Sequence, residues 1–332
     1  MKSFHTTASI AFILFASQLL TFGSPQGYVI WWGSGISDQP SLSSTGVVAV
    51  AGQALTNVIA VAAGHFHALA IRSDGTVVGW GFNQSGQATG NASSDPEYAS
   101  STVRINGQEL SNTIAVSAAW QHSLGLRSDG SVVAWGYGGR YHQTSVPAGL
   151  TGVIAIAAGM DRSLALRKDG SVAGWGSRKV PNWLSNIIAI AVADSDLGFD
   201  LALKSDGTVI QWGRNGIASS APKNVTNITK IASGSSQCLA LRRDGSVLEW
   251  SNATDNATLI TGLSNVVSIA SAQMHCLALK ADGTIAAWGR MDRGRRPAVV
   301  PAGLSNVVAI AAGDNFCLAI TTNAAIAERF HR

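Results

Sequence analysis

Two short apolar segments recur in a fixed order along most of the chain, separated by glycine-rich turns. Each unit reads approximately I/V-A-x-A-G-x-x-x-x-L-A-L-x-x-D-G-x-V-x-x-W-G. Short apolar runs that are rich in alanine and β-branched residues and bounded by glycine are typical of buried strands. The first segment occurs at Val61–Gly64, Val116–Ala119, Ile156–Gly159, Ile190–Ala193, Ile231–Gly234, Ile269–Ala272 and Ile310–Gly313. The second begins at Leu69, Leu124, Leu164, Leu201, Leu239, Leu277 and Leu318.

A hairpin signal leads from the second segment to a third strand that ends in tryptophan. The signal is an Asp-Gly pair, which tolerates the positive φ angles of a tight turn. The tryptophans are Trp32, Trp80, Trp135, Trp175, Trp212, Trp250 and Trp288, and all but Trp250 are followed by glycine. We expect each indole to be buried between neighbouring sheets with its N–H reaching a carbonyl. The glycine then permits a close backbone turn. Each unit is predicted to be a three-stranded meander with a fourth short strand in the variable link.

The two ends of the chain complement each other. Tyr28–Gly33 supplies a Trp-Gly strand without the two strands that should precede it, whereas Ile310–Ile320 supplies those two strands and no Trp-Gly. The tryptophans are spaced 37 to 55 residues apart, and a period near 40 is typical of a propeller or solenoid. Ring closure removes exposed sheet edges. The sequence therefore predicts an all-β, seven-bladed β-propeller in which Val29–Trp32 joins the C-terminal blade.

The N-terminus predicts export. Lys2 is followed by an apolar stretch from Ala8 to Leu20 and then by Gly23 and Ser24, the pattern of a secretory signal peptide. The stretch is short for a membrane anchor and lacks the arginines of a mitochondrial presequence. We expect a signal peptide over residues 1–24 and one propeller over residues 27–332. The protein would be secreted, extracellular or periplasmic, with no membrane contact in its mature form.

Charge and cysteine usage exclude several other classes. Charged residues make up 13% of the chain, the net charge is +4, and the main basic cluster is Arg290–Arg296, so no nucleic-acid partner is expected. Three cysteines, Cys238, Cys276 and Cys317, do not form a disulfide framework. All three precede the Leu-Ala segment, at a repeat position held elsewhere by Ala68, Ser123, Ser163 and Asp200. The favoured interpretation is that small side chains at this position fill a tight packing site. The alternative is a metal or redox role.

The candidate binding residues lie in the link after each first strand, where the repeats differ from one another. Variable loops on a rigid frame commonly carry binding groups, and apolar anchors with a few charges resemble an interface. The predicted partner-binding residues are His65, Phe66, Trp120, Gln121, Met160, Asp161, Asp194, Asp196, Gln273, Met274, Asp314 and Asn315. The aspartates would favour a basic partner. The alternative is that these are merely tolerant turn positions. The long link Phe82–Asn112 is a second candidate surface, either functional or disordered.

Catalysis finds little support in the sequence. It contains no G-x-S-x-G, H-E-x-x-H or phosphate-loop motif. His65 and His67 are two residues apart and could share a metal, but no third ligand is evident, and His122 and His275 recur at the position of His67. His67 is therefore predicted to be structural. We expect no enzyme activity, no cofactor, no metal and a monomeric chain.

Gly81–Gln87, after Trp80, matches a W-G-x-N-x-x-G-Q stretch, while Gly64–Leu69 and Trp120–Leu124 match A-G-x-x-H-S/T-L-A-L. On these motifs the chain resembles, over residues 27 to 332, the regulator of chromosome condensation (RCC1) superfamily. Its chromatin-associated members are exchange factors for a small nuclear GTPase, which the predicted signal peptide argues against. Links such as Val146–Leu150 and Val300–Leu304 (V-P-A-G-L) are closer to the secreted bacterial branch, which includes the propeller-type β-lactamase inhibitory protein.

The resemblance implies the propeller architecture and a recognition rim. The expected function is a secreted, non-catalytic module that binds a protein partner, inhibition being one form of such binding. A carbohydrate or cell-surface binding module is the first alternative, with Trp120, and Trp183 if exposed, stacking on a sugar ring. A propeller hydrolase or lyase is the second, and it would need close carboxylates and histidine on one rim.

Overall fold

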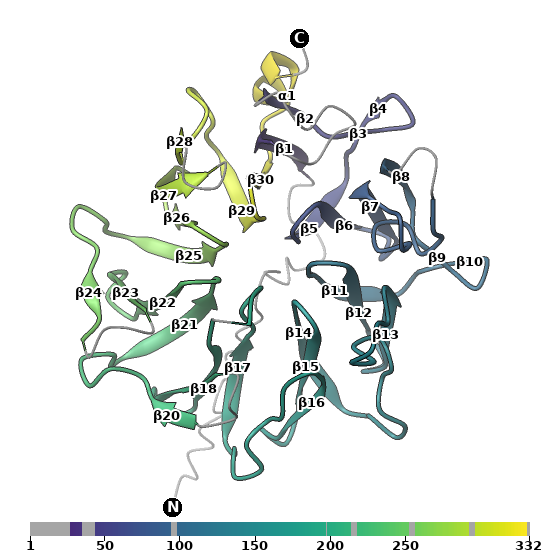
Figure 1. Ribbon diagram of the computed structural model, residues 1–332. Helices are drawn as coiled ribbons and strands as arrows, with labels where there is room; N and C mark the ends of the chain where they lie inside the picture. Colours follow the sequence, from purple (N-terminus) through teal and green to yellow (C-terminus); the bar gives the residue numbers. More distant parts are fainter. Residues whose placement is uncertain are drawn as a thin grey trace, which may run out of the picture.

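Seven antiparallel sheets surround a central axis and form a closed ring (Figure 1). The computed structural model describes residues 27–34, 44–93, 98–196, 198–213, 218–251, 256–291 and 296–330. The predicted all-β, seven-bladed propeller is confirmed. Residues 1–24, predicted as a signal peptide, lie outside the described residues, as do residues 292–295 of the basic cluster. No helix in the described ranges is long and apolar enough to cross a membrane.

The first four blades follow the chain, each with its first strand innermost. Blade 1 contains β5 (Val58–Ala63), β6 (His67–Arg72), β7 (Val77–Phe82) and β8 (Tyr98–Thr102). Blade 2 contains β11 (Thr113–Ala118), β12 (His122–Arg127) and β13 (Val132–Gly136). Blade 3 contains β14 (Val153–Gly159), β15 (Arg162–Arg167) and β16 (Val172–Gly176). Blade 4 contains β17 (Ile187–Ala191), β18 (Asp200–Lys204), β19 (Val209–Trp212) and β20 (Ala218–Ser220).

The last three blades return to the start of the chain. Blade 5 contains β21 (Ile228–Ser233), β22 (Gln237–Arg242), β23 (Val247–Ser251) and β24 (Thr258–Leu259). Blade 6 contains β25 (Val266–Ser271), β26 (His275–Lys280), β27 (Ile285–Met291) and β28 (Arg296–Pro297). Blade 7 contains β29 (Val307–Ala312), β30 (Phe316–Thr321), β1 (Tyr28–Gly33) and β2 (Ser44–Val47). Small hairpins β3 (Ala49–Val50)–β4 (Gln53–Ala54) and β9 (Arg104–Ile105)–β10 (Gln108–Glu109) lie in links.

The predicted fourth strand is not universal. Blades 2 and 3 have three strands, although their links, residues 137–152 and 177–186, are described throughout. The long link Phe82–Asn112 is largely ordered where it is described. Asn83 is buried, and its Oδ1 accepts hydrogen bonds from the backbone N–H groups of Ala88 and Thr89, both at 3.0 Å. A buried amide that replaces missing backbone partners fixes this turn.

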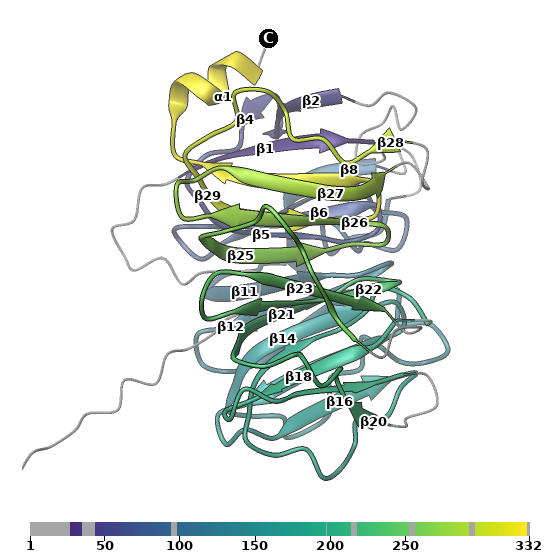
Figure 2. The same cartoon turned by 90° about the vertical axis from the view of Figure 1, so that its left-hand side faces the viewer.

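The ring closes as its ends predict. β1 pairs antiparallel with β30, and Trp32 lies opposite Cys317 as Trp288 lies opposite Cys276 in blade 6. Trp32 therefore occupies the tryptophan position of blade 7. Helix α1 (Ala324–Phe330) lies against β1 and β2 at the outer edge of this blade, and Ala327 is buried in the same core cluster as Trp32 (Figures 1 and 2).

The core lies between blades, and the tryptophans join them. Trp135 of blade 2 packs with Leu69 and Ile71 of blade 1, and its Nε1 donates to the carbonyl of Gln87 at 3.0 Å. Trp175 repeats this one blade later, donating to the carbonyl of Gln143 at 2.7 Å. The predicted indole–carbonyl contact is confirmed at these two positions and is wrong at Trp32, Trp80 and Trp212, whose buried Nε1 atoms have no hydrogen-bond partner within the described part of the chain. Trp250 and Trp288 donate instead to side-chain oxygens of Gln211 and Glu249.

A second set of inter-blade contacts joins the starts of the second strands, and we call it the inter-blade belt. In each contact, the residue at the start of the second strand of one blade meets the next blade at the repeat position held by the cysteines, Ala68, Ser123, Ser163 and Asp200. The polar pairs are His67–Ser123 (2.8 Å), His122–Ser163 (3.0 Å), Arg162–Asp200 (2.8 Å), Gln237–Cys276 (3.5 Å) and His275–Cys317 (3.2 Å). The other two junctions are apolar, with Phe199 near Cys238 and Phe316 near Ala68. The predicted structural role of His67 is confirmed.

The belt also explains the cysteines. All three are free and buried, and burial raises the pKa of the Cys238 and Cys276 thiols to about 12. A thiol that stays protonated is neither a good nucleophile nor a metal ligand. Packing in a tight site, the favoured interpretation, agrees with this burial, and Cys276 and Cys317 in addition receive a polar contact from the preceding blade.

Candidate partner-binding rim

The loops between first and second strands lie on one rim of the ring, and five of them are held in the same way. The carbonyl of the second loop residue accepts a hydrogen bond of 2.8 Å from the backbone N–H two positions after the blade's tryptophan. The accepting carbonyls belong to Phe66, Gln121, Asp161, Met274 and Asn315, and the donors to Phe82, Tyr137, Ser177, Arg290 and Ser34. The backbone of these loops is thus fixed while the side chains vary.

This bond explains the glycine after the tryptophan. Gly81 has a φ of 105°, and a Cβ there would lie 2.4 Å from the carbonyl oxygen of Phe66. Any side chain would therefore be both strained and in collision with the rim loop. In blade 4, Gly213 is not in the positive-φ set and faces the Phe199 ring instead, and blade 5 has Ser251 at this position. Blades 4 and 5 depart from the common arrangement.

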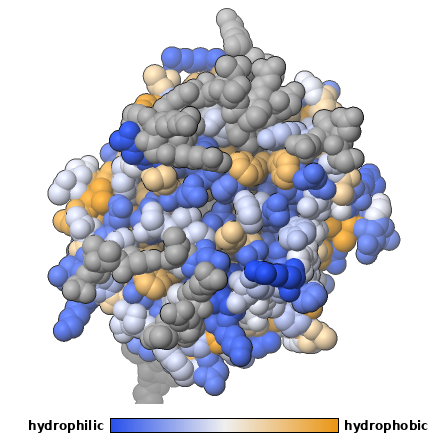
Figure 3. All heavy atoms as spheres, viewed as in Figure 1, coloured by the Kyte–Doolittle hydropathy of each residue, from blue (hydrophilic) through white to orange (hydrophobic). Residues whose placement is uncertain are grey.

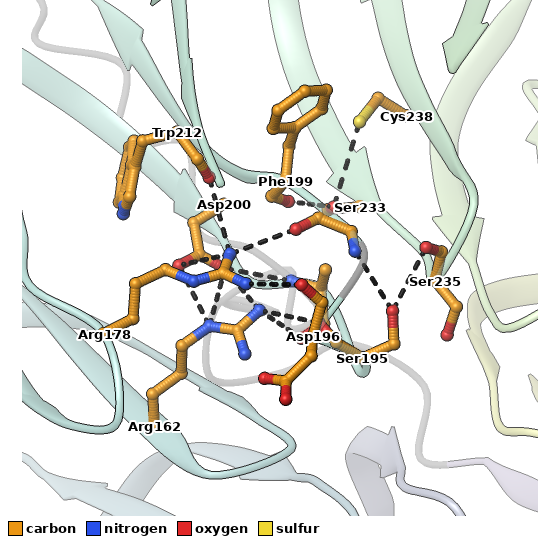
Figure 4. Close-up of polar contacts among 12 residues, drawn as sticks. Arg162, Arg178, Ser195, Asp196, Phe199, Asp200, Trp212, Ser233, Ser235 and Cys238 are labelled. Carbon is orange, nitrogen blue, oxygen red and sulfur yellow. Dashed lines mark hydrogen bonds and ion pairs between the residues drawn. The ribbon is translucent and has the colours of Figure 1, made fainter. Parts of the chain in front are cut away.

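The blade 4 loop, Asp194 to Gly198, is held instead by two buried arginines (Figure 4). Arg162 donates to the carbonyls of Ala193 and Ser195 at 2.9 and 3.2 Å. Arg178, from the link after β16, donates to the carbonyls of Asp196 and Gly198 at 3.1 and 3.0 Å. Both guanidinium groups also contact the carboxylate of Asp200, at 2.8 and 3.3 Å. We call Arg162, Arg178 and Asp200 the arginine clamp. These charge-assisted bonds anchor the backbone of the loop at Ser195, Asp196 and Gly198.

The arginine clamp carries a net positive charge. Its two cations face one carboxylate, and the side chains of Arg162 and Asp200 are completely buried. Buried charge requires compensation nearby. Part of the negative charge of the blade 4 loop therefore compensates the buried arginines. That part of the charge on the rim is not available to a partner.

His65 links loops from opposite sides of the ring. Its Nδ1 lies 3.7 Å from the Asp194 carboxylate of blade 4, and its Nε2 lies 3.3 Å from the Asp314 carboxylate of blade 7. Blades 1 and 4 face each other across the axis in Figure 1. These side chains therefore meet over the mouth of the central channel. The carboxylates of Asp161, Asp194, Asp196 and Asp314 are referred to below as the acidic mouth.

A line of aromatic rings runs from this mouth toward the outer edge of blade 1. The ring centroid of His65 lies 6.0 Å from that of Trp120 and 4.1 Å from that of Phe66. The Phe66 ring contacts Phe82 at 6.3 Å, and the Phe82 ring contacts Tyr98 at 5.9 Å. All contacts are edge-to-face, a favourable geometry for aromatic pairs. Trp120, His65, Phe66, Phe82 and Tyr98 form what we call the aromatic ridge, and all five are half-exposed.

Asp161 has an unusual electrostatic environment. Burial raises the pKa of its carboxyl group, repulsion from Asp196 and Asp194 raises it further, and Arg162 and Arg140 oppose the change. Its backbone carbonyl is bonded to Ser177. Among the described hydrogen bonds, none is accepted by its carboxylate. At neutral pH its negative charge is therefore poorly compensated.

The side chains of the remaining five predicted site residues also lie on this rim. Gln121, Met160 and Gln273 are half-buried, and Asn315 donates through its amide to the Asp314 carboxylate at 2.6 Å. Met274 is the most exposed, at 44%. The structure thus brings His65, Phe66, Trp120, Asp161, Asp194, Asp196, Asp314 and Asn315 together around the mouth and the inner ridge, and the side chains of the other four take part in none of the ring contacts or ion pairs described above.

Sequence reasoning missed Arg162 and Arg178, and it did not single out Phe82 and Tyr98 within the link Phe82–Asn112, its second candidate surface. Phe82 and Tyr98 extend the ridge because β7 and β8 place them opposite each other. Arg162 and Arg178 form the clamp. A signal for Arg162 was present, because it replaces histidine at the belt position while Asp200 replaces the small residue that follows. Opposite charges at two positions that otherwise pair His with Ser or Cys indicate an ion pair between blades.

The rim covers a narrow channel with no evident chemistry. A cavity of about 160 Å³ is lined by small and aliphatic residues of all seven first strands. Within the described ranges, no group of three or more His, Cys, Asp or Glu side chains is arranged to hold a metal ion. Figure 3 shows hydrophobic residues as separate groups among hydrophilic ones on the face seen in Figure 1. A mixed surface of this kind suits a partner that is itself mixed in polarity.

Comparisons with known proteins agree with this architecture. The model of the regulator of chromosome condensation (RCC1) repeat matches residues 58–87 and 114–143. Over 96 residues, the chain is 35% identical to protein pim1 of Schizosaccharomyces pombe, covering 28% of this chain and 18% of that protein. The match therefore spans about a fifth of the relative's length. The chain is a propeller of RCC1-like repeats.

Solved structures extend the likeness to the whole ring. Prp20p of Saccharomyces cerevisiae superposes with a TM-score of 0.71 at 17% identity, covering 92% of this chain and 94% of that one. Human WBSCR16 gives a TM-score of 0.69 at 18% identity, covering 89% and 99%. At these identities the likeness concerns the fold. The binding properties of Prp20p toward Gsp1p and histones belong to that protein.

Proposed function

We propose that the chain is a secreted, non-catalytic module that binds a protein partner through the rim built from the first-strand loops. One observation carries the proposal: His65, Trp120, Asp194 and Asp314, from four different blades, meet at the mouth of the channel. Residues so far apart in the sequence converge only through the fold. Loops that differ in sequence but share one backbone anchor are suited to present a binding surface.

Composition favours a protein partner over a sugar. The aromatic ridge and the acidic mouth combine half-exposed rings with charge, as protein interfaces do. Prp20p shows that a propeller of this fold can serve as a protein-binding frame. The carbohydrate alternative relies in part on Trp183, which is 57% exposed. Trp183 lies close to Asn186, whose backbone meets the Asp169-Gly170 turn, and therefore on the opposite rim, away from Trp120.

The geometry does not favour catalysis by the residues at the mouth. The Nδ1 and Nε2 atoms of His65 lie 3.7 and 3.3 Å from the carboxylates of Asp194 and Asp314, so both ring nitrogens face carboxylates and not a nucleophilic hydroxyl or thiol. Secretion is proposed from residues 1–24 of the sequence. Inhibition of the partner is one possible consequence of binding and would depend on which of the partner's surfaces is covered.

A quantitative capture experiment tests the proposal. The mature chain is used as bait against secreted proteins of the source organism, alongside the double variant Phe66→Ala/Trp120→Ala and the control Trp183→Ala. The double variant is expected to lose a partner that the native chain and the control retain, with all three folded by circular dichroism. Equal capture by all three would show that this rim is not the binding surface. Fractionation of tagged full-length chain tests secretion separately.

A further inference from the structure

Resting on the proposed function, we propose that the partner presents a lysine or arginine next to an apolar or aromatic side chain. The cation sits at the acidic mouth, and the apolar group lies on the aromatic ridge. The two surfaces are continuous, because His65 belongs to both: its ring contacts Trp120 and Phe66, and its nitrogens face Asp194 and Asp314. A partner segment that crosses this junction meets apolar surface and negative charge within a few ångströms.

The ridge supplies the apolar half of the site. Its five rings support one another edge to face, so they lose little freedom when a partner covers them. Half-exposed aromatic side chains of this kind are frequent anchors in protein interfaces. A cation next to Trp120 would also be attracted by the face of the indole.

The mouth supplies the charge. The ring nitrogens of His65 face two of its four carboxylates, those of Asp194 and Asp314. The Asp161 carboxylate receives no hydrogen bond among those described, and neighbouring carboxylates repel it. A cation brought by the partner would supply the compensation that the fold leaves out. Affinity should therefore fall as the pH decreases through the raised pKa of Asp161, because protonation removes the charge.

The arginine clamp anchors the blade 4 part of this surface before a partner binds. Arg162 and Arg178 hold the blade 4 loop through the carbonyls of Ala193, Ser195, Asp196 and Gly198 (Figure 4). The ion-pairing groups of the mouth are therefore positioned by the scaffold and not by the partner, which lowers the entropic cost of association.

Aspartates on the opposite rim differ from Asp161, because their negative charge is already compensated within the fold. Asp206 is typical: its carboxylate accepts a hydrogen bond from the backbone N–H of Thr208 at 2.9 Å and contacts Lys204. These bonds lower its pKa to about 2. A charge that is already compensated gains little from a partner cation. Asp206→Asn is thus a matched control for Asp161→Asn, with the same change in net charge.

The test uses a phage-displayed library of random peptides selected on the native full-length mature chain. Peptides that are recovered are sequenced, and one is synthesised for calorimetry with the native chain and with Asp161→Asn, Trp120→Ala and Asp206→Asn. We expect Lys or Arg beside Trp, Tyr, Phe or Leu in the selected sequences. Affinity should fall about tenfold or more for Asp161→Asn and Trp120→Ala, and not for Asp206→Asn. It should also fall with added salt and with decreasing pH.

Stability provides an independent readout for Asp161. Because its folded-state pKa is raised, ionisation at neutral pH opposes folding, and Asp161→Asn should leave the melting temperature unchanged or raise it. A carboxylate with a structural role would instead lower it. Selected peptides that lack basic residues, or that bind Asp161→Asn as tightly as the native chain, would overturn this inference and leave the rim function in place. Peptides that bind Trp120→Ala and the native chain equally would overturn both.

Discussion

His65 and His67 are two residues apart and belong to two different regions of the molecule. His65 lies on the rim, half-exposed, and contacts carboxylates from blades 4 and 7. His67 lies in the inter-blade belt, completely buried, and contacts only the next blade through Ser123. The belt position recurs as His122 and His275, whereas the rim position does not recur as histidine. Repetition around the ring marks residues that hold blades together, and departure from it marks residues that are available for a partner.

The chemistry of the two histidines differs for the same reason. Ser123 Oγ donates to the carbonyl of Gln87 at 2.8 Å, so it must accept from the protonated Nε2 of His67. The Nδ1 of His67 is buried without a hydrogen-bond partner. A second proton there would create a buried, unpaired charge. Burial accordingly lowers the pKa of His67 and of His122 to about 3 and that of His275 to about 4.

Acid should therefore unfold the protein through the belt, and this is the largest effect we expect. The unfolded chain binds protons at these histidines from about pH 6.5 downward, whereas in the folded chain His275 does so only near pH 4, and His67 and His122 only near pH 3. Their contribution to stability is therefore present above pH 6.5 and is lost as the pH falls from 6.5 toward these values. Each histidine contributes a slope of up to about 1.4 kcal/mol per pH unit. Urea unfolding at pH 7, 6, 5 and 4.5 measures it.

Two variants distinguish the contribution of the belt histidines to the pH dependence of stability from that of the rim histidine. His275→Gln keeps a donor toward Cys317, as Gln237 does toward Cys276 in the native chain, and should reduce the slope by about one histidine's share. His65→Ala should leave the slope due to the belt in place. An unchanged slope in His275→Gln would show that the belt histidines are not neutral in the folded state.

Two tryptophans give the next largest contrast. Trp135 is buried between blades 1 and 2 and donates to Gln87, so Trp135→Ala should cost about 3–5 kcal/mol of unfolding free energy. Trp120 lies half-exposed on the rim, and Trp120→Ala should cost about 1 kcal/mol or less. Chemical denaturation of both variants measures the difference. Equal losses would mean that Trp120 belongs to the scaffold and that the ridge is not a binding surface.

Much of the fold was predictable because blade formation depends on local pattern. The Asp-Gly turns, the Trp-Gly ends and the complementary termini each have one structural solution, and β1 joins β30 of the C-terminal blade as predicted. The fourth strands were less predictable, since blades 2 and 3 fill the same space with links that form none. Those links carry no periodic pattern from which pairing can be inferred.

The repeat predicted which residues lie on the rim, but it did not predict how their side chains contact one another. The repeat places His65, Asp194 and Asp314 on one rim, but it does not say that long and short side chains meet across the axis. Tyr98 joins the ridge only through pairing of β7 with β8, beyond a variable link. Arg178 has no counterpart in the repeat. His65, Trp120, Asp194 and Asp314 hold the same repeat position in four blades, so the repeat aligns them but does not reveal the side-chain contacts that they make with one another.

The smallest contrast concerns Cys317, whose Sγ lies 3.2 Å from Nε2 of His275 in the belt. Cys317→Ala removes that partner and leaves the buried Nε2 of His275 unpaired, at a cost of about 1–3 kcal/mol. Cys317→Ser should cost less, because His67–Ser123 and His122–Ser163 are the same pair with a hydroxyl. Thermal and urea unfolding of both variants give the comparison. If serine were as damaging as alanine, Cys317 would act through its volume alone, and the belt would be a packing feature at this junction. If serine is the milder change, the histidine contact itself stabilises the closure between blades 6 and 7.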